Sequence, residues 1–400
     1  MKFKLQEIVD VTMGQSPKSE FYNTERKGYP FLQGNRTFGF KYPTFDTYTT
    51  VMTKPAKAGD VIMSVRAPVG DLNITPVDMC LGRGVCSLRM KNGNQSFLYY
   101  MMKYYVPHLL KKESGTVFGS VNRNDINGLE VDIPEDEQNQ RRIARYLEMI
   151  DEKIELNTAI NNNLEQQAQL LFKSWFVDFE PFNGTMPSDW EVVPFEEIVD
   201  FQNGYAFKSK ELINEPSSDC YQVFKQGHIA RGGGFIPDGT KSWYPKRLAS
   251  KLERFVLKKG DILMAMTDMK DNVAILGNTA IMPIDNEYIV NQRVGHLRAN
   301  GYKGITYPFI YLLTNSTDFL IDLRSRANSG VQVNLSSAEI KASQTVLPSE
   351  KVNTAFSEIT LPMFEAIISN QLENQRLAQL RDALLPKLMS GEVDVSDINL

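Results

Sequence analysis

The sequence contains few of the residues from which disulfide frameworks and metal sites are built. Among its 400 residues there are three cysteines and three histidines, and both kinds are scattered. Cys80, Cys86 and Cys220 are too few and too badly spaced for a disulfide framework or a zinc site. We therefore expect three reduced thiols, in the core or near the surface. Among the histidines, only His228 falls at a position that suggests a function.

Long apolar runs are also absent. No stretch approaches the roughly 18 uninterrupted apolar residues of a membrane-spanning helix. The first residues, Met1-Lys2-Phe3-Lys4, lack the apolar core of a signal peptide. The hydrophobic fraction of 42% is ordinary for a soluble globular protein. Together these features predict a cytoplasmic location.

The motifs of the common enzyme classes are missing as well. The sequence has no GxxxxGK[ST] phosphate loop, no HExxH, no CxxC pair and no GxSxG nucleophile elbow. The glycine-rich segment from Arg231 to Gly234 does not follow the strand-turn-helix pattern of a dinucleotide site, so we interpret it as a flexible loop. The Asn-Pro-Pro-Tyr-like tetrad of amino-methyltransferases is absent too. We therefore expect a non-catalytic chain that binds no cofactor or metal itself.

The net charge of −4 argues against a simple basic nucleic-acid binder until the charge is assigned to segments. Residues 1–134 carry +5, from 17 Lys and Arg against 12 Asp and Glu, and residues 183–348 are neutral, with 18 of each. Residues 135–182 carry −5, from 5 against 10, and residues 349–400 carry −4, from 4 against 8. Because binding of a polyanion depends on the local potential, residues 1–134 and, more weakly, 183–348 remain eligible.

The sequence contains one pattern twice. Residues 4–176 and 194–390 align as a globular stretch followed by a long helix-like stretch. The short matches pair FLQGN from Phe31 with FKQGH from Phe224, KAGDVIM from Lys57 with KKGDILM from Lys258, and LGRGVCSLR from Leu81 with VNQRVGHLR from Val290. A duplication of this length predicts a pseudo-twofold molecule, which suits a target that itself has two halves.

Two long amphipathic helices are predicted. From Glu135 to about Trp175 there is no Gly or Pro, and apolar residues recur in steps of three and four. This spacing places them on one stripe of a helix about 60 Å long. The segment from Val352 to Leu388 repeats the pattern, with Pro362 expected to kink that helix or mark its start. We expect the two helices to pack on each other as an antiparallel coiled coil.

Asparagines interrupt both apolar stripes, at Asn157 and Asn161 in the first and at Asn370 and Asn374 in the second. A polar residue on such a seam lowers stability but can fix register and partner. Rotation of these side chains into solvent fits the sequence equally well.

The other segments predict mixed α/β domains. Residues 60–65 and 261–266 are strand-like runs after a glycine turn, and residues 97–110 and 308–323 are apolar enough for buried helices. The predicted fold class is therefore α+β, with two pseudo-symmetric mixed α/β domains separated by two long antiparallel coiled-coil helices. The predicted segments are a domain at 1–134, a helix and linker at 135–180, a domain at 181–348, and a helix and tail at 349–400.

Several motifs are similar to those of a known family. They are Pro134 with Glu137-Gln138, Ile143, Leu147, Asp151 and Ile154; LFKSWFVDFEPF at 171–182; LRDALLPKLMSGE at 380–392; GQSP at 14–17; and SVRAPVG at 64–70. Over essentially its whole length, the chain resembles the DNA sequence-specificity (S) subunit of Type I restriction-modification systems. The second copy departs from the family pattern: residues 204–207 contain no proline, 267–271 replace the RAPVG stretch, and 349–351 lack the Glu-Gln pair. These departures bear on individual contacts rather than on the architecture.

The resemblance implies a non-catalytic subunit that reads double-stranded DNA. Residues 1–134 and 181–348 would be target-recognition domains, each reading one half of a bipartite asymmetric site, and the helix pair would set the spacer. Two methyltransferase subunits would grip the helices and methylate adenine, and restriction/translocase subunits would complete the complex. S-adenosylmethionine, ATP and Mg would be held by those partners and not by this chain.

Candidate DNA-binding residues follow from the chemistry of base readout, in which Arg or Lys contacts guanine and Asn or Gln contacts adenine, with further cations on phosphates. In the first half they are Gln15, Ser16, Lys18, Gln33, Asn35, Arg36, Arg66 and Arg123. In the second half they are Lys208, Lys225, Gln226, His228, Arg231, Lys241 and Lys270. Gln33 and Gln226 recur at equivalent positions, where they either read bases or cap a shared turn. Arg83 and Arg293 recur in strand-like sequence, where we expect structural salt bridges.

Two aromatic groups have alternative interpretations. Trp175, Phe176 and Phe179 either form a docking surface for a methyltransferase subunit or staple the linker to the helices. The aromatic residues from Phe38 to Tyr48 either stack on unpaired bases or, as we favour, pack their loop against the domain.

Two other functions are compatible with the sequence. A self-contained DNA modification enzyme would bind S-adenosylmethionine without partners, and the lack of a cofactor loop argues against it. A protein-interaction scaffold with no DNA role is favoured by the acidic total charge. Salt-dependent binding to one bipartite duplex would distinguish the DNA reader from this scaffold.

Overall fold

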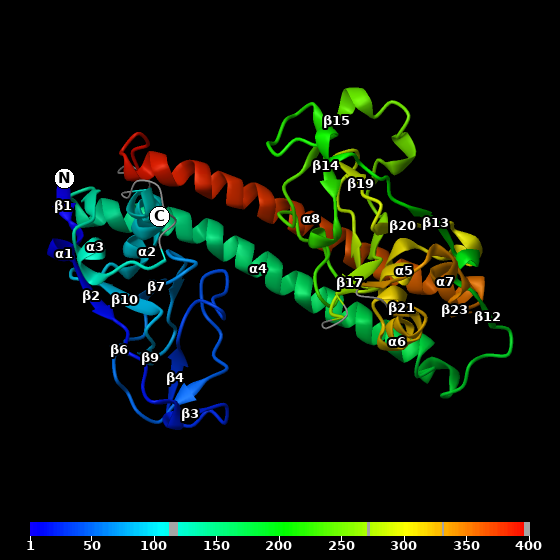
Figure 1. Ribbon diagram of the computed structural model, residues 1–400. Coiled ribbons are helices and arrows are strands. Elements are labelled where there is room, and N and C mark those ends of the chain that lie inside the picture. Colours follow the sequence, from blue (N-terminus) through cyan, green and yellow to red (C-terminus); the bar gives the residue numbers. More distant parts are fainter. Residues whose placement is uncertain (112–118, 270–272, 330–331, 396–400) are drawn as a thin grey trace. The chain divides into compact units, whose positions relative to one another are not determined.

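The chain divides into two compact units. The computed structural model describes residues 1–111, 119–269, 273–329 and 332–395 (Figure 1). Unit 1 comprises Met1–Glu155 and Asn374–Leu400, and unit 2 comprises Leu156–Glu373. The boundaries fall inside the two long helices, α4 (Glu137–Phe176) and α8 (Glu350–Met389), so each unit contains a part of both. The sequence-based division at residues 134, 180 and 348 stays a prediction.

Unit 1 is organised around a four-stranded antiparallel sheet with the order β2-β10-β7-β8. A five-stranded sheet with the order β3-β5-β4-β9-β6 and a β1-β11 pair complete it. Its strands are β1 (Lys2–Lys4), β2 (Val9–Met13), β3 (Tyr22–Asn23), β4 (Tyr29–Leu32), β5 (Tyr48–Thr49), β6 (Pro55–Ala56), β7 (Val61–Ser64), β8 (Leu72–Ile74), β9 (Met79–Leu81), β10 (Val85–Met90) and β11 (Glu130–Asp132). Its short helices are α1 (Leu5–Ile8), α2 (Gln95–Lys111) and α3 (Arg123–Asn127).

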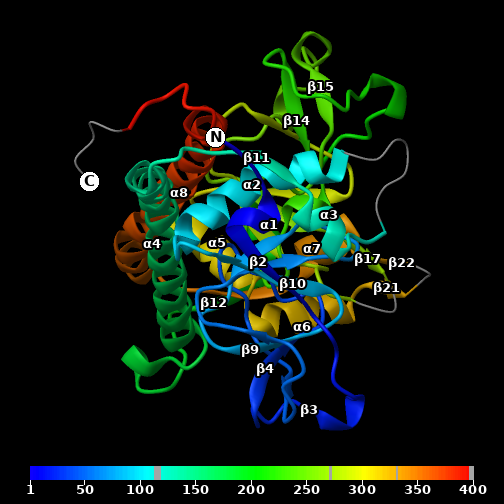
Figure 2. The same ribbon diagram turned by 90° about the vertical axis from the view of Figure 1, so that its left-hand side faces the viewer.

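Helix α2 covers one face of the four-stranded sheet, as Figure 2 shows. Every residue of β7 is buried, and the β7 side chains Val61 and Met63 meet Phe97 and Met101 of α2 in one apolar core. A strand that is buried along its whole length requires cover on both faces. Helix α2 supplies that cover on one of them.

Unit 2 repeats this plan. Its four-stranded sheet has the order β13-β20-β16-β18, β12 pairs with β23, and two three-stranded sheets have the orders β15-β14-β19 and β17-β22-β21. The strands are β12 (Glu191–Pro194), β13 (Val199–Asn203), β14 (Cys220–Phe224), β15 (Trp243–Pro245), β16 (Ile262–Ala265), β17 (Thr267–Met269), β18 (Thr279–Ile281), β19 (Tyr288–Val290), β20 (Val294–Ala299), β21 (Asn328–Ser329), β22 (Gln332–Asn334) and β23 (Gln344–Leu347). The helices are α5 (Tyr307–Thr314), α6 (Thr317–Ser325) and α7 (Ser337–Ala342).

The predicted α+β class and the duplicated architecture are confirmed. The strand-like runs after Gly59 and Gly260 are β7 and β16, and the apolar segment at 97–110 lies within α2. Two details differ. The segment at 308–323 forms two helices, α5 and α6, and Pro362 lies well inside α8 instead of starting it. Pro362 and Glu358 are both exposed, so water can bond the carbonyl that the missing N–H leaves free.

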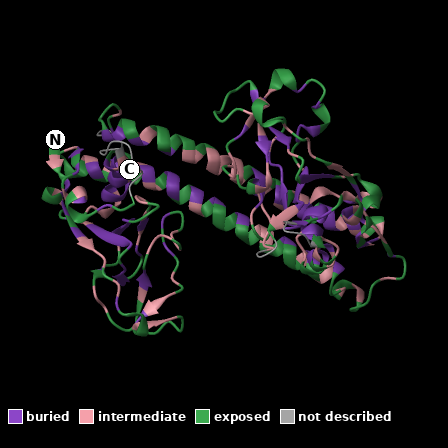
Figure 3. Ribbon diagram, viewed as in Figure 1, coloured by how far each residue is buried: buried purple, intermediate pink, exposed green. Residues whose placement is uncertain are grey.

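The two long helices pair in antiparallel register within each unit. In unit 1, Ile143 and Leu147 of α4 share a core with Leu385 and Leu388 of α8. In unit 2, the Phe176 ring of α4 lies 4.8 Å from the Phe356 ring of α8, measured between centroids. Figure 3 shows buried and exposed residues alternating along both helices, as an amphipathic stripe requires.

The asparagines lie on the seam and not in solvent. Asn157 and Asn161 are 1% and 8% exposed. In unit 2 the Asn161 side chain donates to the backbone oxygen of Ile367 at 3.2 Å, and in unit 1 the Asn374 side chain donates to the oxygen of Ile154 at 3.4 Å. The two donors, Asn161 and Asn374, are 213 positions apart in the sequence, and so are the two acceptors, Ile154 and Ile367. The two bonds are therefore two copies of one interaction.

A buried ion pair also joins α4 to α8 in unit 1. Asp151 is fully buried, and its carboxylate accepts from the Arg381 guanidinium and from the Tyr100 hydroxyl of α2, each at 2.8 Å. Arg381 is 8% exposed and also pairs with Asp382 at 2.8 Å. The network therefore ties both long helices to the helix that covers the sheet.

Replacing Arg381 by Met should destabilise unit 1 by about 3–5 kcal/mol, because the Asp151 carboxylate would stay buried without its paired cation. Urea unfolding, with hydrogen exchange of the α2 amides as the reporter of unit 1, measures the change. The control is Arg145→Met, which breaks a half-exposed ion pair with Glu152 and should cost less than about 1 kcal/mol. Equal effects of the two variants would contradict a structural role of the buried pair.

Candidate nucleic-acid interface

Three loops of unit 1 meet at one end of the four-stranded sheet. The first contains Gln15, the second Gln33, and the third is the turn from Leu81 to Val85 that joins β9 to β10. The Gln15 N–H donates to the oxygen of Leu81 at 2.9 Å, and the Gly84 N–H donates to the oxygen of Gln33 at 2.9 Å. These backbone bonds bring two candidate glutamines, both exposed, to the two sides of one turn.

Glycine makes this close approach possible. A Cβ atom on Gly14 would collide with the carbonyl oxygen of Gly82, and one on Gly84 would collide with the oxygen of Gln33. Only a residue without a side chain fits where backbones pass this closely. The glycines around Gln15 and Arg83 are therefore part of the construction of the surface.

Unit 2 contains the same junction. The Gly14 N–H donates to the oxygen of Val85 at 3.0 Å, and the Gly204 N–H donates to the oxygen of Val294 at 3.1 Å. In the same way, the Tyr205 N–H donates to the oxygen of Val290 at 2.9 Å, the bond that Gln15 makes to Leu81 in unit 1. The turn from Val290 to Val294 is thus the counterpart of the turn from Leu81 to Val85.

The expected salt bridges of Arg83 and Arg293 are not present. Both side chains are exposed, and neither forms an ion pair with any residue that the structure describes. The repeated ion pairs belong to the last arginine of each motif: Arg89 pairs with Asp60 at 2.6 Å, and Arg298 pairs with Asp261 at 2.7 Å. When the two turns are aligned, Arg83 corresponds to Gln292, and Arg293 stands one position later. The two arginines are therefore not equivalent.

The two buried aspartates differ in their surroundings. Burial raises the pKa of the Asp60 carboxyl, although the Lys57 N–H and Arg89 oppose this. Burial also acts to raise the pKa of Asp261, but hydrogen bonds from His296 and Arg298 outweigh it and hold that pKa below its usual range. The two sites differ because His296 lies beside Asp261, with its Nε2 2.8 Å from that carboxylate.

The predicted residues of the first half lie mostly on the surface. Gln15, Lys18, Gln33, Arg36, Arg66 and Arg123 are exposed, and Ser16 and Asn35 are half-buried. The Ser16 hydroxyl accepts from the Arg83 N–H at 3.1 Å, which adds Ser16 to the loop junction. Arg36 pairs with Asp46 at 2.6 Å, Asn35 donates to Asp71, and Lys18 lies 3.7 Å from Glu20. Gln33 and Arg66 make no such side-chain contact with the described part of the chain.

The loop that carries Asn35 and Arg36 rests on the long helices of unit 1. Lys41 is 5% exposed, and its ammonium lies 4.0 Å from Glu148 of α4. The Phe40 ring lies 5.7 Å from the guanidinium carbon of Arg381 in α8. Phe38 and Phe45 pack against the domain, as we favoured, while Phe40 and Tyr42 remain about half exposed. These contacts fix the position of the loop.

The predicted residues of the second half are more divided. Lys208, Arg231 and Lys241 are exposed, and Lys225 is half-buried. The Gln226 side chain donates to the backbone oxygen of Thr267 at 2.6 Å, a bond that Gln33 does not repeat, so a shared turn cap stays a prediction. Lys270 lies outside the described residues.

His228 is a buried residue of unit 2. Its ring stacks 5.0 Å from that of Phe224, and Nδ1 accepts from the Lys225 N–H at 3.1 Å. Burial lowers the pKa of His228 to about 4, so the ring is neutral at physiological pH. In this structure it presents no face to solvent.

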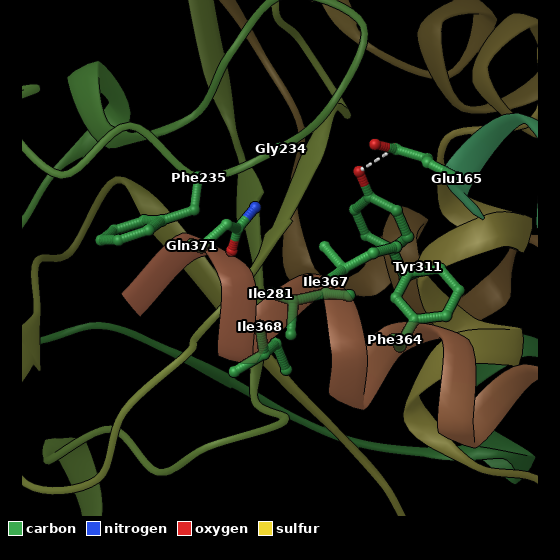
Figure 4. Close-up of a pocket in the computed structure, with 9 residues that line it drawn as sticks. All are labelled: Glu165, Gly234, Phe235, Ile281, Tyr311, Phe364, Ile367, Ile368 and Gln371. Carbon is green, nitrogen blue, oxygen red and sulfur yellow. Dashed lines mark hydrogen bonds between the residues drawn. The ribbon is translucent and has the colours of Figure 1, made fainter. Parts of the chain in front are cut away.

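The glycine-rich loop is held by short backbone contacts. The Gly234 N–H donates to the oxygen of Thr279 at 2.9 Å, and Gly233 packs against the Asn315 side chain. Figure 4 shows Gly234 and Phe235 beside a small pocket whose other walls include Tyr311, Glu165 and side chains of α8. The Tyr311 hydroxyl donates to Glu165 at 2.7 Å, and burial raises its pKa well above the usual range. Arg231 therefore projects from a loop that is packed against this part of unit 2.

The aromatic residues at the end of α4 pack inside unit 2. Phe176 is 6% exposed and lies 5.8 Å from the Trp190 ring, and Phe179 lies 6.0 Å from the same ring. Trp175 contacts Phe356 at 5.8 Å. This packing staples the segment after α4 to the core, which is one of the two roles that the sequence allowed.

The surface therefore offers amide and guanidinium groups on a rigid backbone. Each unit contributes one copy of the turn, and unit 1 adds two exposed glutamines. Arg83 in unit 1 and Arg293 in unit 2 form no ion pair with the residues that the structure describes. Arg83, Gln292 and Arg293 were not among the DNA-binding residues predicted from the sequence, although they lie in a motif that recurs in both halves. Within the described ranges, no group of three His, Cys, Asp or Glu residues could hold a metal ion. None of the helices in these ranges combines the length and the apolar character of a membrane span.

Comparison with known proteins gives consistent similarities. The family model described as Type I restriction modification DNA specificity domain matches residues 1–166 and 187–381. The MjaIX specificity subunit of a type I restriction enzyme from Methanocaldococcus jannaschii is 24% identical, over 99% of this chain and 94% of that protein. A second protein of that organism, provisionally named the MjaX specificity subunit, is 36% identical over 39% of this chain, and the match spans 37% of its own length.

A solved structure has a similar fold. The crystal structure of the Type-I restriction-modification system S subunit from M. genitalium aligns with a TM-score of 0.61 at 18% identity, over 97% of this chain and 96% of that one. At this level of identity the similarity concerns the fold.

The two buried aspartates should respond differently to substitution. Asp261→Asn should destabilise unit 2 at neutral pH, because the ionised carboxylate is favoured in the folded state, whereas Asp60→Asn should leave unit 1 almost unchanged. The contribution of Asp261 is fully present above the unfolded aspartate pKa of about 3.9 and is lost as the pH falls through its lower folded value. Urea unfolding of both variants from pH 7 to pH 3 measures this. A loss from Asp261→Asn that is equally large at pH 3 would contradict the assignment.

Proposed function

Because the chain belongs to the family of Type I restriction modification DNA specificity proteins, we propose that it reads a bipartite DNA site, one half-site with each of its two units. As a specificity subunit it is the non-catalytic component of such a system. The half-sites and the partner subunits are our proposals.

The duplicated loop junction is the observation that carries the proposal. The turn from Leu81 to Val85 and the turn from Val290 to Val294 share two backbone hydrogen bonds, whose distances agree within 0.1 Å. The side chains that project from these turns differ. A duplicated scaffold with different polar side chains is suited to two different short sequences, because base edges are distinguished by donor and acceptor pattern.

The distribution of charge supports contact through the globular parts. Residues 1–134 carry +5, and the two helical segments carry −5 and −4. Because phosphates attract cations and repel carboxylates, the loops are suited to the duplex and the helical flanks to protein partners. The second globular part, residues 183–348, is neutral and therefore depends more on direct contacts to bases.

We further propose the partners and their cofactors. Two methyltransferase subunits would bind the helical region, and restriction/translocase subunits would join them in a cytoplasmic complex. S-adenosylmethionine, ATP and Mg would be bound by those subunits. Adenine methylation would then occur at the site that this chain selects.

The experiment that tests the proposal is methylome sequencing of a host that carries this chain together with its methyltransferase subunits. The expected result is one methylated motif made of two short specified sequences and a spacer of fixed length. A motif with a single specified part, or methylation independent of this chain, would refute the two-reader proposal.

The spacer should depend on the length of the helices. Insertion of seven residues into both α4 and α8 preserves the apolar stripe and adds about 10 Å to each helix. At about 3.4 Å per base pair, the spacer should lengthen by about three base pairs while both specified sequences stay the same. The same sequencing measures it, with a seven-residue insertion in α4 alone as the control that disrupts pairing. An unchanged spacer in the double insertion would show that the helices do not set the distance.

A further inference from the structure

We propose that Arg83 and Gln292 are equivalent base-reading residues, with Arg83 contacting a guanine in the first half-site and Gln292 an adenine in the second. The inference rests on the proposed function and specifies what each unit reads. Neither residue was a candidate from sequence, because the recurrence of arginine pointed to Arg83 and Arg293 instead.

The two residues stand at the same point of the repeated turn. On the preceding side, Leu81 accepts from the Gln15 N–H and Val290 accepts from the Tyr205 N–H, both at 2.9 Å. On the following side, Val85 and Val294 accept from Gly14 and Gly204 at 3.0 and 3.1 Å. Arg83 and Gln292 are each the third residue of a five-residue turn bounded by these bonds.

Both side chains are available to a ligand. Each is exposed, and none of the described residues gives either side chain a hydrogen bond or an ion pair. In contrast, Asn35, Arg36 and Gln226 are all engaged within the protein. Arg83 and Gln292 therefore keep their full donor and acceptor capacity for an external partner.

The backbone beneath each side chain is held firmly. The Arg83 N–H donates to the Ser16 hydroxyl at 3.1 Å, and the next residue, Gly84, donates to Gln33. The Gln292 N–H donates to the oxygen of Tyr205 and to the Asn291 side chain, each at 2.9 Å. A backbone fixed before binding reduces the ordering cost that a long side chain pays when it reads a base.

The chemical difference between the two residues determines the base. A guanidinium presents two donors side by side, which match the O6 and N7 acceptors of guanine in the major groove. A glutamine amide presents one acceptor and one donor, which match N6 and N7 of adenine. One scaffold position occupied by Arg in one unit and Gln in the other thus produces an asymmetric site from a duplicated fold.

The test exchanges the two residues. Complexes of Arg83→Gln or Gln292→Arg with the methyltransferase subunits methylate a library of randomised duplexes with S-adenosylmethionine, and the methylated motifs are sequenced. With Arg83→Gln, one position of the first half-site should lose its preference for a G·C pair, by roughly ten- to a hundredfold, and shift towards A·T. Gln292→Arg should shift one position of the second half-site in the opposite direction. Every other specified base should stay the same.

The matched control is Arg89→Gln, which lies six residues from Arg83 but is paired with buried Asp60. It should lower the melting temperature and leave the motif unchanged. If Arg83→Gln abolishes methylation, Arg83→Lys, which retains a guanine-reading donor, must restore the wild-type motif, and its failure would overturn the assignment. Unchanged motifs in both exchanges, with a bipartite motif in the wild type, would refute this inference alone. A wild type without a bipartite motif would refute the proposed function.

Discussion

Antiparallel pairing of the two long helices is the constraint on which the other features depend. Apolar side chains drive the pairing but would tolerate a shift by one turn, because most positions on the stripe are alike. The asparagine amides do not tolerate it. Asn161 bonds the carbonyl of Ile367, and Asn374 bonds that of Ile154, at positions related by the same shift along the chain. A shift by one turn would also separate the side-chain pairs Asn370–Asn161 and Asn157–Glu373, which bond at 2.9 and 2.7 Å, at a cost of about 1–3 kcal/mol for each buried group left without a partner.

The helix register also determines what each domain meets on the helices. In unit 1 the Tyr100 hydroxyl reaches Asp151, and in unit 2 the Tyr311 hydroxyl reaches Glu165. The same kind of contact, a tyrosine of α2 or α5 bonded to a carboxylate of α4, thus anchors each domain. A buried hydroxyl needs a partner, so these contacts resist sliding of the domain along the helix. Loops that read a sequence require such a fixed support.

The fold was largely predictable because its signals repeat and are periodic. Apolar residues at helical spacing in a segment without Gly or Pro identified α4, and the matching run identified α8. The failures were local. Pro362 does not mark the start of α8, because the solvent side of the helix can hydrate the carbonyl that loses its bond. The break between α5 and α6 at Asn315 involves bonds between that side chain and Thr279, which lies far away in sequence. Whether the Asn161 side chain faces the seam or the solvent could not be predicted without knowing that α8 lies opposite it.

The site was less predictable, because residue type says what a side chain can bind and not whether it is already bound. Gln33 and Gln226 occupy equivalent positions, yet Gln33 is exposed and Gln226 is bonded to Thr267. Arg83 and Arg89 are neighbours in sequence, yet only Arg89 lies beside a buried carboxylate, since β10 pairs with β7 and brings it next to Asp60. Arg89, in the strand, therefore has a structural role. Arg83, in the turn before it, forms no ion pair with the residues that the structure describes. In a duplicated domain, specificity can change because these two roles belong to different residues. Arg89 maintains the sheet through its ion pair, while Arg83 can be replaced without loss of the fold.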